Sequence, residues 1–381
     1  MKILFISMPS IHVIRWIENL KDTEHELYWF DVINRGELNT IPSVQQFVGW
    51  KKRKLPYIKG EYFLSKKAPI IYNLLKSSLE VTENKALERV LKKIKPDIVH
   101  SFEMQSCSYP ILKTMQKFPN IKWIYSCWGS DLFYYQNFEC HYRKIKRVLR
   151  RIDYLHTDCQ RDHDIAIQLG FSGTFSGLIP GGTGFKLKEL KSHKKPVNER
   201  KIILIKGYQH LFGRALNTIK AIQSIKESLA EYEIVIFGAH SEVQNYTIEQ
   251  NLGFKVYGRH DLSHQQLMEL FGKSLLYIGN SISDGMPNTL LEAIAMGAFP
   301  IQSNPGGATA ELISHGENGL LIQDPDDVDG IASLIAQAIS SKELLLKASC
   351  INEKLATENL DYTFNQNKVI ALYDNFKKLK F

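Results

Sequence analysis

The chain has 381 residues, of which 44% are hydrophobic and 23% charged, a composition typical of a globular protein with about two domains. It contains no run of about eighteen apolar residues, so no membrane-spanning helix is expected. Five cysteines without a C-x-x-C pair argue against a disulfide framework and a structural zinc site, and favour a reducing compartment. Residues 1–185 hold 27 of the 48 Lys and Arg and 18 of the 40 Asp and Glu, which gives them a net charge of +9. The remaining residues hold 21 Lys and Arg and 22 Asp and Glu, a net charge of −1.

The first predicted element is a buried strand at residues 2–7, followed by a loop and a helix that begins over residues 16–20. Polar residues interrupt the apolar start, so we interpret it as a strand and not as a signal peptide, and expect a cytoplasmic protein. Ligands of parallel α/β sheets bind at loops that follow the strands, so His12 and Arg15 are candidates for facing a cleft between domains. A capping histidine and a surface arginine are the alternative. The loop lacks G-x-G-x-x-G, which gives a dinucleotide site little support.

Residues 49–67 form a basic tract that is interleaved with the aromatic residues Trp50, Tyr57, Tyr62 and Phe63. No nucleic-acid recognition module accompanies the tract, so nucleic acid is not the expected partner. Clustered Lys and Arg beside aromatic side chains suit an anionic membrane surface or a lipid diphosphate. A solvated basic face is the alternative.

The rest of the first half reads as alternating helices and strands. The pattern predicts helices at 85–95 and 162–169, and strands at 97–101, 123–126 and 154–157. Glu103 follows one of these strands, and the loop C-W-G-S-D-L-F, with Trp128 and Asp131, follows the next. Asp131 is the best polar candidate of this half, with a helix N-cap as its alternative role.

A polar, lysine-rich and aperiodic segment at residues 186–200 is predicted to be a linker. Beyond it we expect strands at 202–205, 233–238 and 256–258, helices at 215–225, 262–271 and 328–339, and a last amphipathic helix at 361–378. Ser263 is a possible N-cap of the second of these helices.

The most informative stretch is residues 275–307, which predicts a strand, a loop, a helix and a second strand. The chain turns at Asp284-Gly285, Pro287 starts the helix and Gly297 ends it. The free N–H groups at this helix start favour a phosphate, and Glu292, one turn in, could accept hydrogen bonds from sugar or ribose hydroxyls. The plainer alternative makes Asp284 a turn former and Glu292 a solvated helix residue.

The letters D-G-M-P-N-T-L-L-E-A, G-A-F-P-I and S-N-P-G-G-A-T-A-E-L-I resemble the E-x7-E region of retaining glycosyltransferases of the family-4 kind. H-G-E-N-G-L-L-I-Q-D-P-D-D, at residues 315–327, resembles the segment that follows it. The resemblance implies the B-type fold, an α/β fold in which two Rossmann-like domains, here 1–185 and 201–360, face each other across a cleft. The last helix, 361–381, crosses back to the first domain. It also implies that no metal or other cofactor is needed.

Residue roles follow from the same resemblance. Asp284 stands where the family has its first glutamate and would contact the donor sugar, while Glu292 would contact the nucleotide ribose. Lys206 and Arg214 are the nearest cations to the donor diphosphate, although their spacing departs from G-R-x-x-x-x-K-G. The remaining donor-binding candidates are Gly285, Met286, Pro287, Asn288 and Thr289.

On the acceptor side, the opening P-S-x-H-x-x-R-W resembles that of some family members and supplies His12 and Arg15. Where the family commonly has H-G-x-D, this chain has Trp128 in place of the histidine and Asp131 as the matching aspartate. If that histidine assists the reaction, its role is vacant here or is taken by His12 or His100. Glu103 completes the acceptor-side candidates.

The sequence therefore predicts a retaining glycosyltransferase, with Asp284, Asp131 and Arg214 as catalytic candidates. The donor is a nucleotide diphosphate sugar bound by the second domain. The acceptor is a hydroxyl, expected on a lipid-linked saccharide of bacterial capsule, O-antigen or exopolysaccharide assembly, with the protein peripheral to the inner face of the cell membrane. A nucleotide-sugar epimerase on the same fold and a catalytically silent nucleotide-sugar-binding partner are the alternatives.

Overall fold

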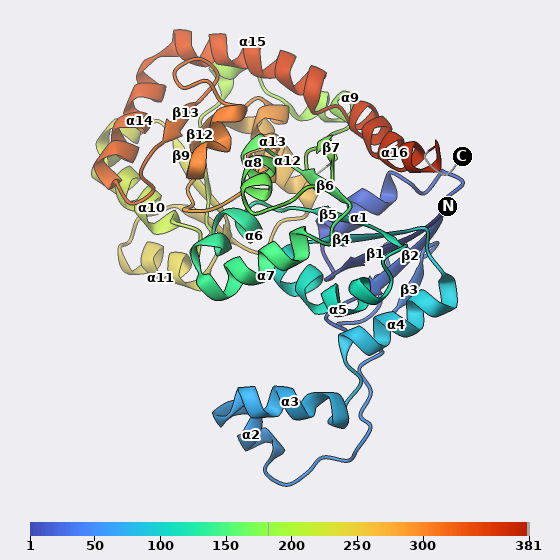
Figure 1. Ribbon diagram of the computed structural model, residues 1–381. Coiled ribbons are helices and arrows are strands. Elements are labelled where there is room, and N and C mark those ends of the chain that lie inside the picture. Colours follow the sequence, from blue (N-terminus) through green and yellow to red (C-terminus); the bar gives the residue numbers. More distant parts are fainter. Residues whose placement is uncertain (182, 379–381) are drawn as a thin grey trace. The chain divides into compact units, whose positions relative to one another are not determined.

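The computed structural model describes residues 1–181 and 183–378 (Figure 1). The chain packs as two compact units, the first made of residues 1–157, 163–177 and 369–378, and the second of residues 158–162 and 178–368. The sequence analysis placed the first change of domain after residue 185 and the return at 361; in the structure they come at residues 178 and 369, and the short segment 158–162 joins the second unit. Gly182, within the segment predicted to close the first domain, lies outside the described residues.

The first unit is built on a seven-stranded sheet in the order β3-β2-β1-β4-β5-β6-β7. The pairs from β3 to β6 are parallel, and in register Ile3 of β1 lies opposite Leu27 of β2 and Ile98 of β4. The strands are β1 (Lys2–Ser7), β2 (Glu26–Asp31), β3 (Gln45–Phe47), β4 (Ile98–Phe102), β5 (Lys122–Ser126), β6 (Tyr154–Thr157) and β7 (Thr174–Leu178).

Helices connect most of these strands, while the described residues 32–44, between β2 and β3, contain no helix. They are α1 (Ile11–Glu18), α2 (Glu61–Lys67), α3 (Pro69–Leu79), α4 (Glu83–Ile94), α5 (Tyr109–Lys117), α6 (Ser130–Phe133), α7 (Glu139–Leu149) and α8 (Gln160–Gln168). The predicted helix start at residue 16 is wrong: α1 begins at Ile11, because the side chain of Ser10 accepts a hydrogen bond from the His12 N–H and caps the helix.

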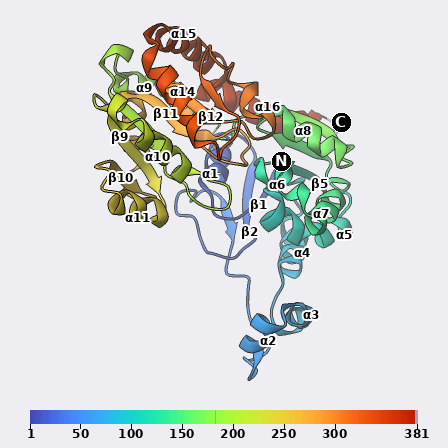
Figure 2. The same cartoon turned by 90° about the vertical axis from the view of Figure 1, so that its left-hand side faces the viewer.

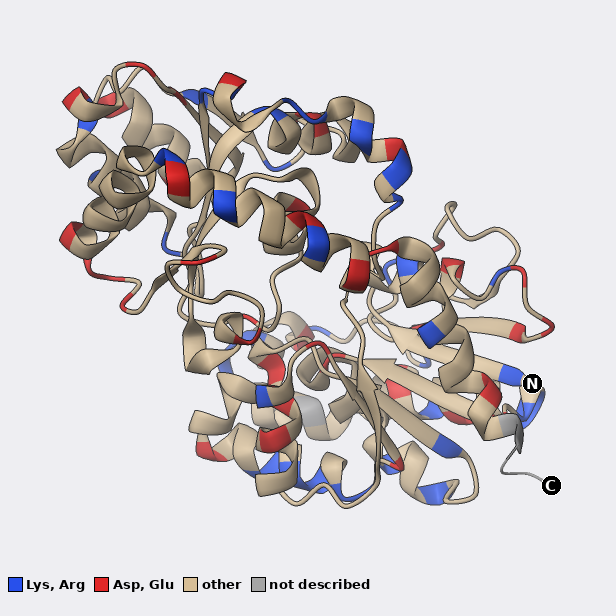
Figure 3. Cartoon of the chain, turned by 90° about the horizontal axis from the view of Figure 1, so that it is seen from above, with Lys and Arg blue, Asp and Glu red and all other residues tan. Residues whose placement is uncertain are grey.

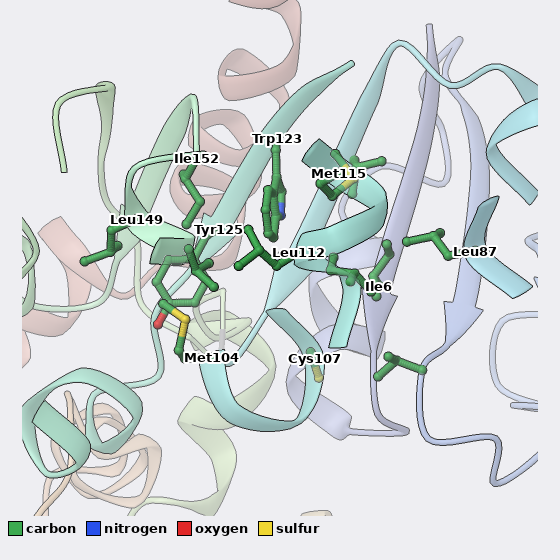
Figure 4. Packing of buried hydrophobic residues seen from close by; sticks show 14 of the residues in the cluster. Ile6, Leu87, Met104, Cys107, Leu112, Met115, Trp123, Tyr125, Leu149 and Ile152 are labelled. Carbon is green, nitrogen blue, oxygen red and sulfur yellow. The ribbon is translucent and has the colours of Figure 1, made fainter. Parts of the chain in front are cut away.

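The core of the first unit lies between this sheet and the helices packed on it. Ile6 of β1 and Trp123 and Tyr125 of β5 are fully buried against Leu87 of α4 and Met115 of α5 (Figure 4). Large buried side chains at alternate strand positions fix which face of the sheet each helix covers.

A polar cluster is buried on the sheet of the same unit, where the end of the last helix, α16 (Tyr362–Lys378), is fastened. The Tyr373 hydroxyl lies 2.5 Å from Nδ1 of His100 and accepts a 2.8 Å hydrogen bond from the Trp16 indole. Nε2 of His100 lies 2.7 Å from the Ser126 hydroxyl. Burial lowers the pKa of His100 well below its usual range, so this histidine stays neutral.

The second unit contains a six-stranded sheet in the order β10-β9-β8-β11-β12-β13, with every neighbouring pair parallel. Its strands are β8 (Ile202–Lys206), β9 (Glu233–Ala239), β10 (Lys255–Gly258), β11 (Ser274–Gly279), β12 (Phe299–Ser303) and β13 (Leu320–Ile322). Its helices are α10 (Ala215–Ser224), α11 (Ser241–Glu249), α12 (His264–Lys273), α13 (Asn288–Met296), α14 (Val328–Ser340) and α15 (Lys342–Asn359). Both sheets are of the Rossmann type, which confirms the predicted fold class.

The segment predicted to be an aperiodic linker contains short helices instead: α9 (Leu187–Leu190), η3 (Lys191–His193) and η4 (Val197–Glu199). It also packs on the second unit, because the Arg200 guanidinium is buried and donates to the carbonyls of Ser274 and Met296. Satisfying those carbonyls fixes the start of β8 against β11.

Charged residues lie mainly on helices and loops (Figure 3). Among the described helices, none has both the length and the apolar content needed to cross a bilayer.

Candidate active site

In the second unit the strand order reverses between β8 and β11, and ligands of open α/β sheets bind outside the strand ends at such a point. Lys206 ends β8, and Asp284 lies in the loop between β11 and α13. Nζ of Lys206 lies 3.8 Å from Oδ2 of Asp284, and both side chains are only partly exposed. The structure therefore places a predicted cation and a predicted carboxylate together at the switch point.

Backbone hydrogen bonds join the two loops that carry these residues. The Arg214 N–H donates to the carbonyl of Asn280 at 3.0 Å, and the Ile282 N–H donates to that of Phe212 at 2.9 Å. The guanidinium of Arg214, however, contacts Asp326 at 3.4 Å and the carbonyl of Gly213 at 3.0 Å. The two predicted phosphate ligands thus have different partners, and it is Lys206 that pairs with Asp284.

Sequence reasoning missed a tyrosine and an arginine that lie beside Lys206. The Tyr208 ring has Nζ of Lys206 4.8 Å from its centroid and Cζ of Arg259 5.6 Å from it. Arg259 follows β10, so two strand-end loops bring positive charge to one tyrosine. The arrangement offers a third cation for an anionic ligand.

The donor-motif residues form the start of α13. Pro287 occupies the N-cap position, and no side chain caps the helix, so its first N–H groups are directed out of the helix end at Asn288. Gly285 is required by close packing, because a Cβ there would lie 2.6 Å from Oδ1 of Asp158. Gly285, Met286 and Pro287 are buried, and the Thr289 hydroxyl lies 2.8 Å from that of Tyr277.

Glu292 is buried, with only 5% of its surface exposed, so the alternative of a solvated helix residue is wrong. Its Oε1 lies 2.9 Å from Nε2 of His264, the first residue of α12. Ser263 caps α12 in a capping box with Gln266, which confirms the predicted N-cap and fixes the position of His264. His264 was missed because it lies 28 residues from Glu292 in the chain.

The segment 158–162 braces the loop that carries Asp284. The Arg161 guanidinium, 8% exposed, donates to the carbonyls of Asp284 at 2.8 Å and Pro305 at 2.6 Å. It also pairs with Asp162 at 2.7 Å. Asp158, Cys159 and Asp162 place ligand atoms within 4.8 Å of one another, but the guanidinium already pairs with one of the two carboxylates, Asp162. Burial raises the pKa of the Asp158 carboxyl, and a backbone hydrogen bond from Met286 opposes that rise.

In the first unit the strand order reverses between β1 and β4, and the acceptor-side candidates gather near these strand ends. The rings of His12 and Trp128 are in edge contact, with centroids 5.5 Å apart. The ring of Phe102, the last residue of β4, lies 6.4 Å from that of Trp128. Arg15 is one turn beyond His12 on α1 and partly exposed. His100, by contrast, is fully buried against Ser126 and Tyr373, so it cannot replace the missing family histidine and that prediction is wrong.

Asp131 is 3% exposed and accepts hydrogen bonds from several groups of its own unit. Oδ1 accepts from the Trp128 N–H at 2.9 Å and the Cys127 thiol at 3.1 Å. Oδ2 accepts from the Tyr125 hydroxyl at 2.5 Å and the Met104 N–H at 3.1 Å. Gly129, not Asp131, occupies the N-cap position of α6, so that alternative is wrong. These contacts fix the loop that carries Trp128, and the catalytic role predicted for Asp131 stays a prediction.

Glu103 follows β4 with a positive φ of 66°, a conformation that a non-glycine residue rarely adopts outside a constrained site. Its carboxylate accepts hydrogen bonds from the Gln105 and Ser106 N–H groups at 2.8 and 2.6 Å. Burial and the neighbouring Asp131 raise the pKa of Glu103 to about 7, so this carboxyl exchanges its proton near neutral pH.

A Glu103→Gln variant is expected to flatten the dependence of stability on pH between about 4.5 and 7. The folded state holds the Glu103 proton up to about pH 7, whereas the unfolded state releases it near 4.5, so wild-type stability falls as pH rises through this window. Urea unfolding at several pH values measures the slope, and Glu139→Gln, an exposed control, should keep it. An unchanged slope in Glu103→Gln would contradict the raised pKa.

Comparison with known proteins gives two family matches. Residues 2–159 match the model described as "Glycosyl transferase 4-like", and residues 186–355 match "Glycosyl transferases group 1". Among curated proteins, the GtfA subunit of the UDP-N-acetylglucosamine–peptide N-acetylglucosaminyltransferase of Streptococcus parasanguinis is 28% identical over 113 residues. That alignment covers 30% of this chain and 22% of the GtfA subunit.

Solved structures share the fold along nearly the whole chain. Sucrose-phosphate synthase from Thermosynechococcus elongatus aligns with a TM-score of 0.72 and 16% identity over 99% of each chain. Anabaena Alr3699/HepE, solved with UDP and glucose, gives 0.66 and 14% identity over 98% of this chain and 99% of its own. A glycosyltransferase from Rickettsia africae aligns with a TM-score of 0.66 and 16% identity, over 99% of this chain and 98% of its own. At these identities the likeness concerns the fold alone.

Proposed function

From the premise that the chain belongs to the glycosyltransferases of group 1 with the B-type fold, we propose that it transfers a sugar from a UDP-sugar to an acceptor hydroxyl. The observation that carries the proposal is the Lys206–Asp284 pair at the switch point of the second sheet, next to the start of α13. Anabaena Alr3699/HepE was solved with UDP and with UDP-glucose, which favours uridine as the base.

Departure of the nucleotide diphosphate is the step that most needs the protein, because negative charge builds on the leaving oxygen. The N–H groups of a helix start are held in place beforehand, and a lysine beside them can add its positive charge to the stabilisation. Lys206 would turn from Asp284 to the diphosphate, which leaves the Asp284 carboxylate for the hydroxyls of the donor sugar. This arrangement needs no metal ion, and we propose metal-independent transfer.

Glu292 would bind the nucleotide ribose. A carboxylate has two oxygens, so it can accept ribose hydroxyls and keep its contact with His264. Because Glu292 is buried and fixed by α12, its position is set before the donor arrives.

We propose retention of the anomeric configuration, with the acceptor bound by the first unit near His12, Arg15, Trp128 and Glu103. A lipid-linked saccharide of bacterial surface-polysaccharide assembly is the proposed acceptor, and the basic excess of the first 185 residues supports it. An epimerase would form product without acceptor. A catalytically silent partner protein would bind the donor without turning it over. Asp284 and Trp128 suggest this alternative, because they stand at family positions that are usually Glu and His.

A thermal-shift panel of UDP, GDP, ADP and UDP-sugars tests the donor site. We expect UDP compounds alone to raise the Tm, by roughly 5–10 °C at about 100 times Kd, since binding to the folded state contributes about 2.7 kcal/mol there. Glu292→Ala should lose most of this shift, while Glu317→Ala, an exposed glutamate of the same unit, should keep it.

Either of two results would count against the proposal. If GDP or ADP compounds stabilise the protein and UDP compounds do not, uridine is wrong. If none stabilises it at millimolar concentration, the nucleotide-sugar site itself is wrong.

A further inference from the structure

A helical arm, here defined as residues 50–80, projects from the first unit and contains α2 and α3. Both views of the molecule show these helices apart from the sheet to which the arm connects (Figures 1 and 2). Nine of the 17 exposed large apolar side chains among the described residues belong to the arm: Leu55, Tyr57, Ile58, Tyr62, Phe63, Ile70, Ile71, Leu74 and Leu75. Contiguous exposed apolar side chains in this number indicate an interaction surface.

The apolar side chains of α3 form one stripe. Ile70 and Leu74 are 79% and 75% exposed, and they lie one helical turn apart. Ile71 and Leu75 follow the same spacing beside them and are 52% and 47% exposed. The stripe therefore faces solvent over residues 70–75 of the helix, and Leu79, one turn beyond Leu75, is buried.

The buried contacts of the arm, in contrast, are ionic. Glu61 is buried and accepts two hydrogen bonds from the Arg53 guanidinium, at 2.6 and 2.8 Å. Glu80 is also buried, with Nζ of Lys76 and Nζ of Lys51 at 3.9 and 3.7 Å. Most apolar side chains of the arm thus lie outside, while the two buried carboxylates form ion pairs; Leu79, at the end of α3, is also buried.

The charge of the arm shows what kind of partner it fits. Residues 50–80 hold eight Lys and Arg against two carboxylates, Glu61 and Glu80, a net charge of +6. Arg53 pairs with Glu61, and Lys51 and Lys76 lie beside Glu80. Besides these, five lysines of the arm are exposed: Lys52, Lys54, Lys59, Lys66 and Lys67. A second copy of the chain would bring two surfaces of this charge together, so self-association through the arm is opposed.

We propose that the helical arm docks the protein on an anionic membrane surface, with the apolar side chains of α2 and α3 among the lipid headgroups and the exposed lysines on lipid phosphates. A membrane adapts to a projecting surface, whereas a folded partner would have to supply a matching groove. The proposal rests on the proposed function only in that docking would bring the acceptor site to a lipid-linked saccharide.

Flotation with vesicles tests the docking directly. The purified full chain should float with phosphatidylcholine vesicles containing phosphatidylglycerol, bind pure phosphatidylcholine at least about ten times more weakly, and lose binding as salt rises. The double variant Ile70→Gln/Leu74→Gln removes two apolar side chains from the stripe, and its affinity should fall by about ten-fold or more. Lys66→Glu/Lys67→Glu should remove the preference for anionic lipid.

Two matched variants of the second unit control for composition and charge. Ile248→Gln changes an isoleucine that is 76% exposed, and Lys220→Glu/Lys347→Glu reverses two exposed lysines. Both should float like the wild type. The UDP thermal shift should be unchanged in all these variants, so a failure of docking is distinguishable from a failure of the donor site.

The proposal is overturned if the wild type does not float with anionic vesicles, or if the arm variants and the controls bind them equally. It is also overturned if sedimentation shows an arm-dependent dimer, or if the arm variants lose only the binding of an acidic protein.

Discussion

Lys206→Ala is expected to lower kcat by about 100- to 1,000-fold with the UDP-sugar that the thermal-shift panel identifies, the effect of removing one preorganised charge from a leaving group. The backbone of the lysine is fixed at the end of β8 before any ligand binds, so only its side chain has to turn from Asp284 to the diphosphate. Because the charge on the diphosphate grows towards the transition state, kcat should change more than KM.

Lys220→Ala is the matched control, since it removes an exposed lysine from α10 of the same unit and should leave kcat unchanged. Lys206→Arg should recover part of the lost rate. A fall in kcat of less than about ten-fold in Lys206→Ala would show that Arg214, Arg259 or the helix start carries the charge instead, because each ten-fold step corresponds to about 1.4 kcal/mol.

Asp131→Ala is expected to lower the free energy of unfolding by about 3–5 kcal/mol. The substitution leaves the Tyr125 hydroxyl and the N–H groups of Met104 and Trp128 buried without their acceptor, and each such group costs about 1–3 kcal/mol. Urea unfolding, followed by the fluorescence of the first unit's tryptophans, measures the change.

Two further variants separate stability from catalysis. Glu139→Ala breaks an exposed ion pair with Arg143 and should change stability by less than about 0.5 kcal/mol. Asp131→Asn keeps the shape and an acceptor oxygen. If Asp131→Asn abolished transfer while unfolding like the wild type, the residue would be catalytic and not positioning.

The sequence predicted the fold well where a strand is a short, fully apolar run. The central strand at residues 202–205, Ile-Ile-Leu-Ile, was found for this reason, whereas the strand at 154–157 was found although it contains His156 and Thr157. The strands β2 and β3 were missed: β2 begins with the exposed Glu26, and β3, at the edge of the sheet, has only three residues. The arm was recognised by its lysines and aromatics, but α2 and α3 were not, because their apolar side chains have no core to face.

The site was predictable where the residues share one segment. Asp284, Asn288 and Glu292 lie within a single loop and helix, so their spacing alone placed them together. The partners that fix them come from elsewhere. Arg161 lies 123 residues from Asp284 and His264 lies 28 from Glu292, and nothing local in a sequence marks such contacts. Arg214 was placed near the diphosphate by resemblance, and its contact with Asp326 depends on a residue more than one hundred positions away.

The buried Tyr373 is synthesised long after the residues to which it is hydrogen-bonded. The hydroxyl of this residue serves Trp16 and His100, which leave the ribosome more than 270 residues earlier. At about 5–20 residues per second, the first sheet waits at least some thirteen seconds for its last hydrogen-bond partner. Until then the Trp16 indole and Nδ1 of His100 lack their hydrogen bonds to Tyr373. The first unit therefore completes its folding only after the second unit has been translated. A nascent chain stalled before residue 369 should be digested by protease in its first unit, and the released full-length chain should resist.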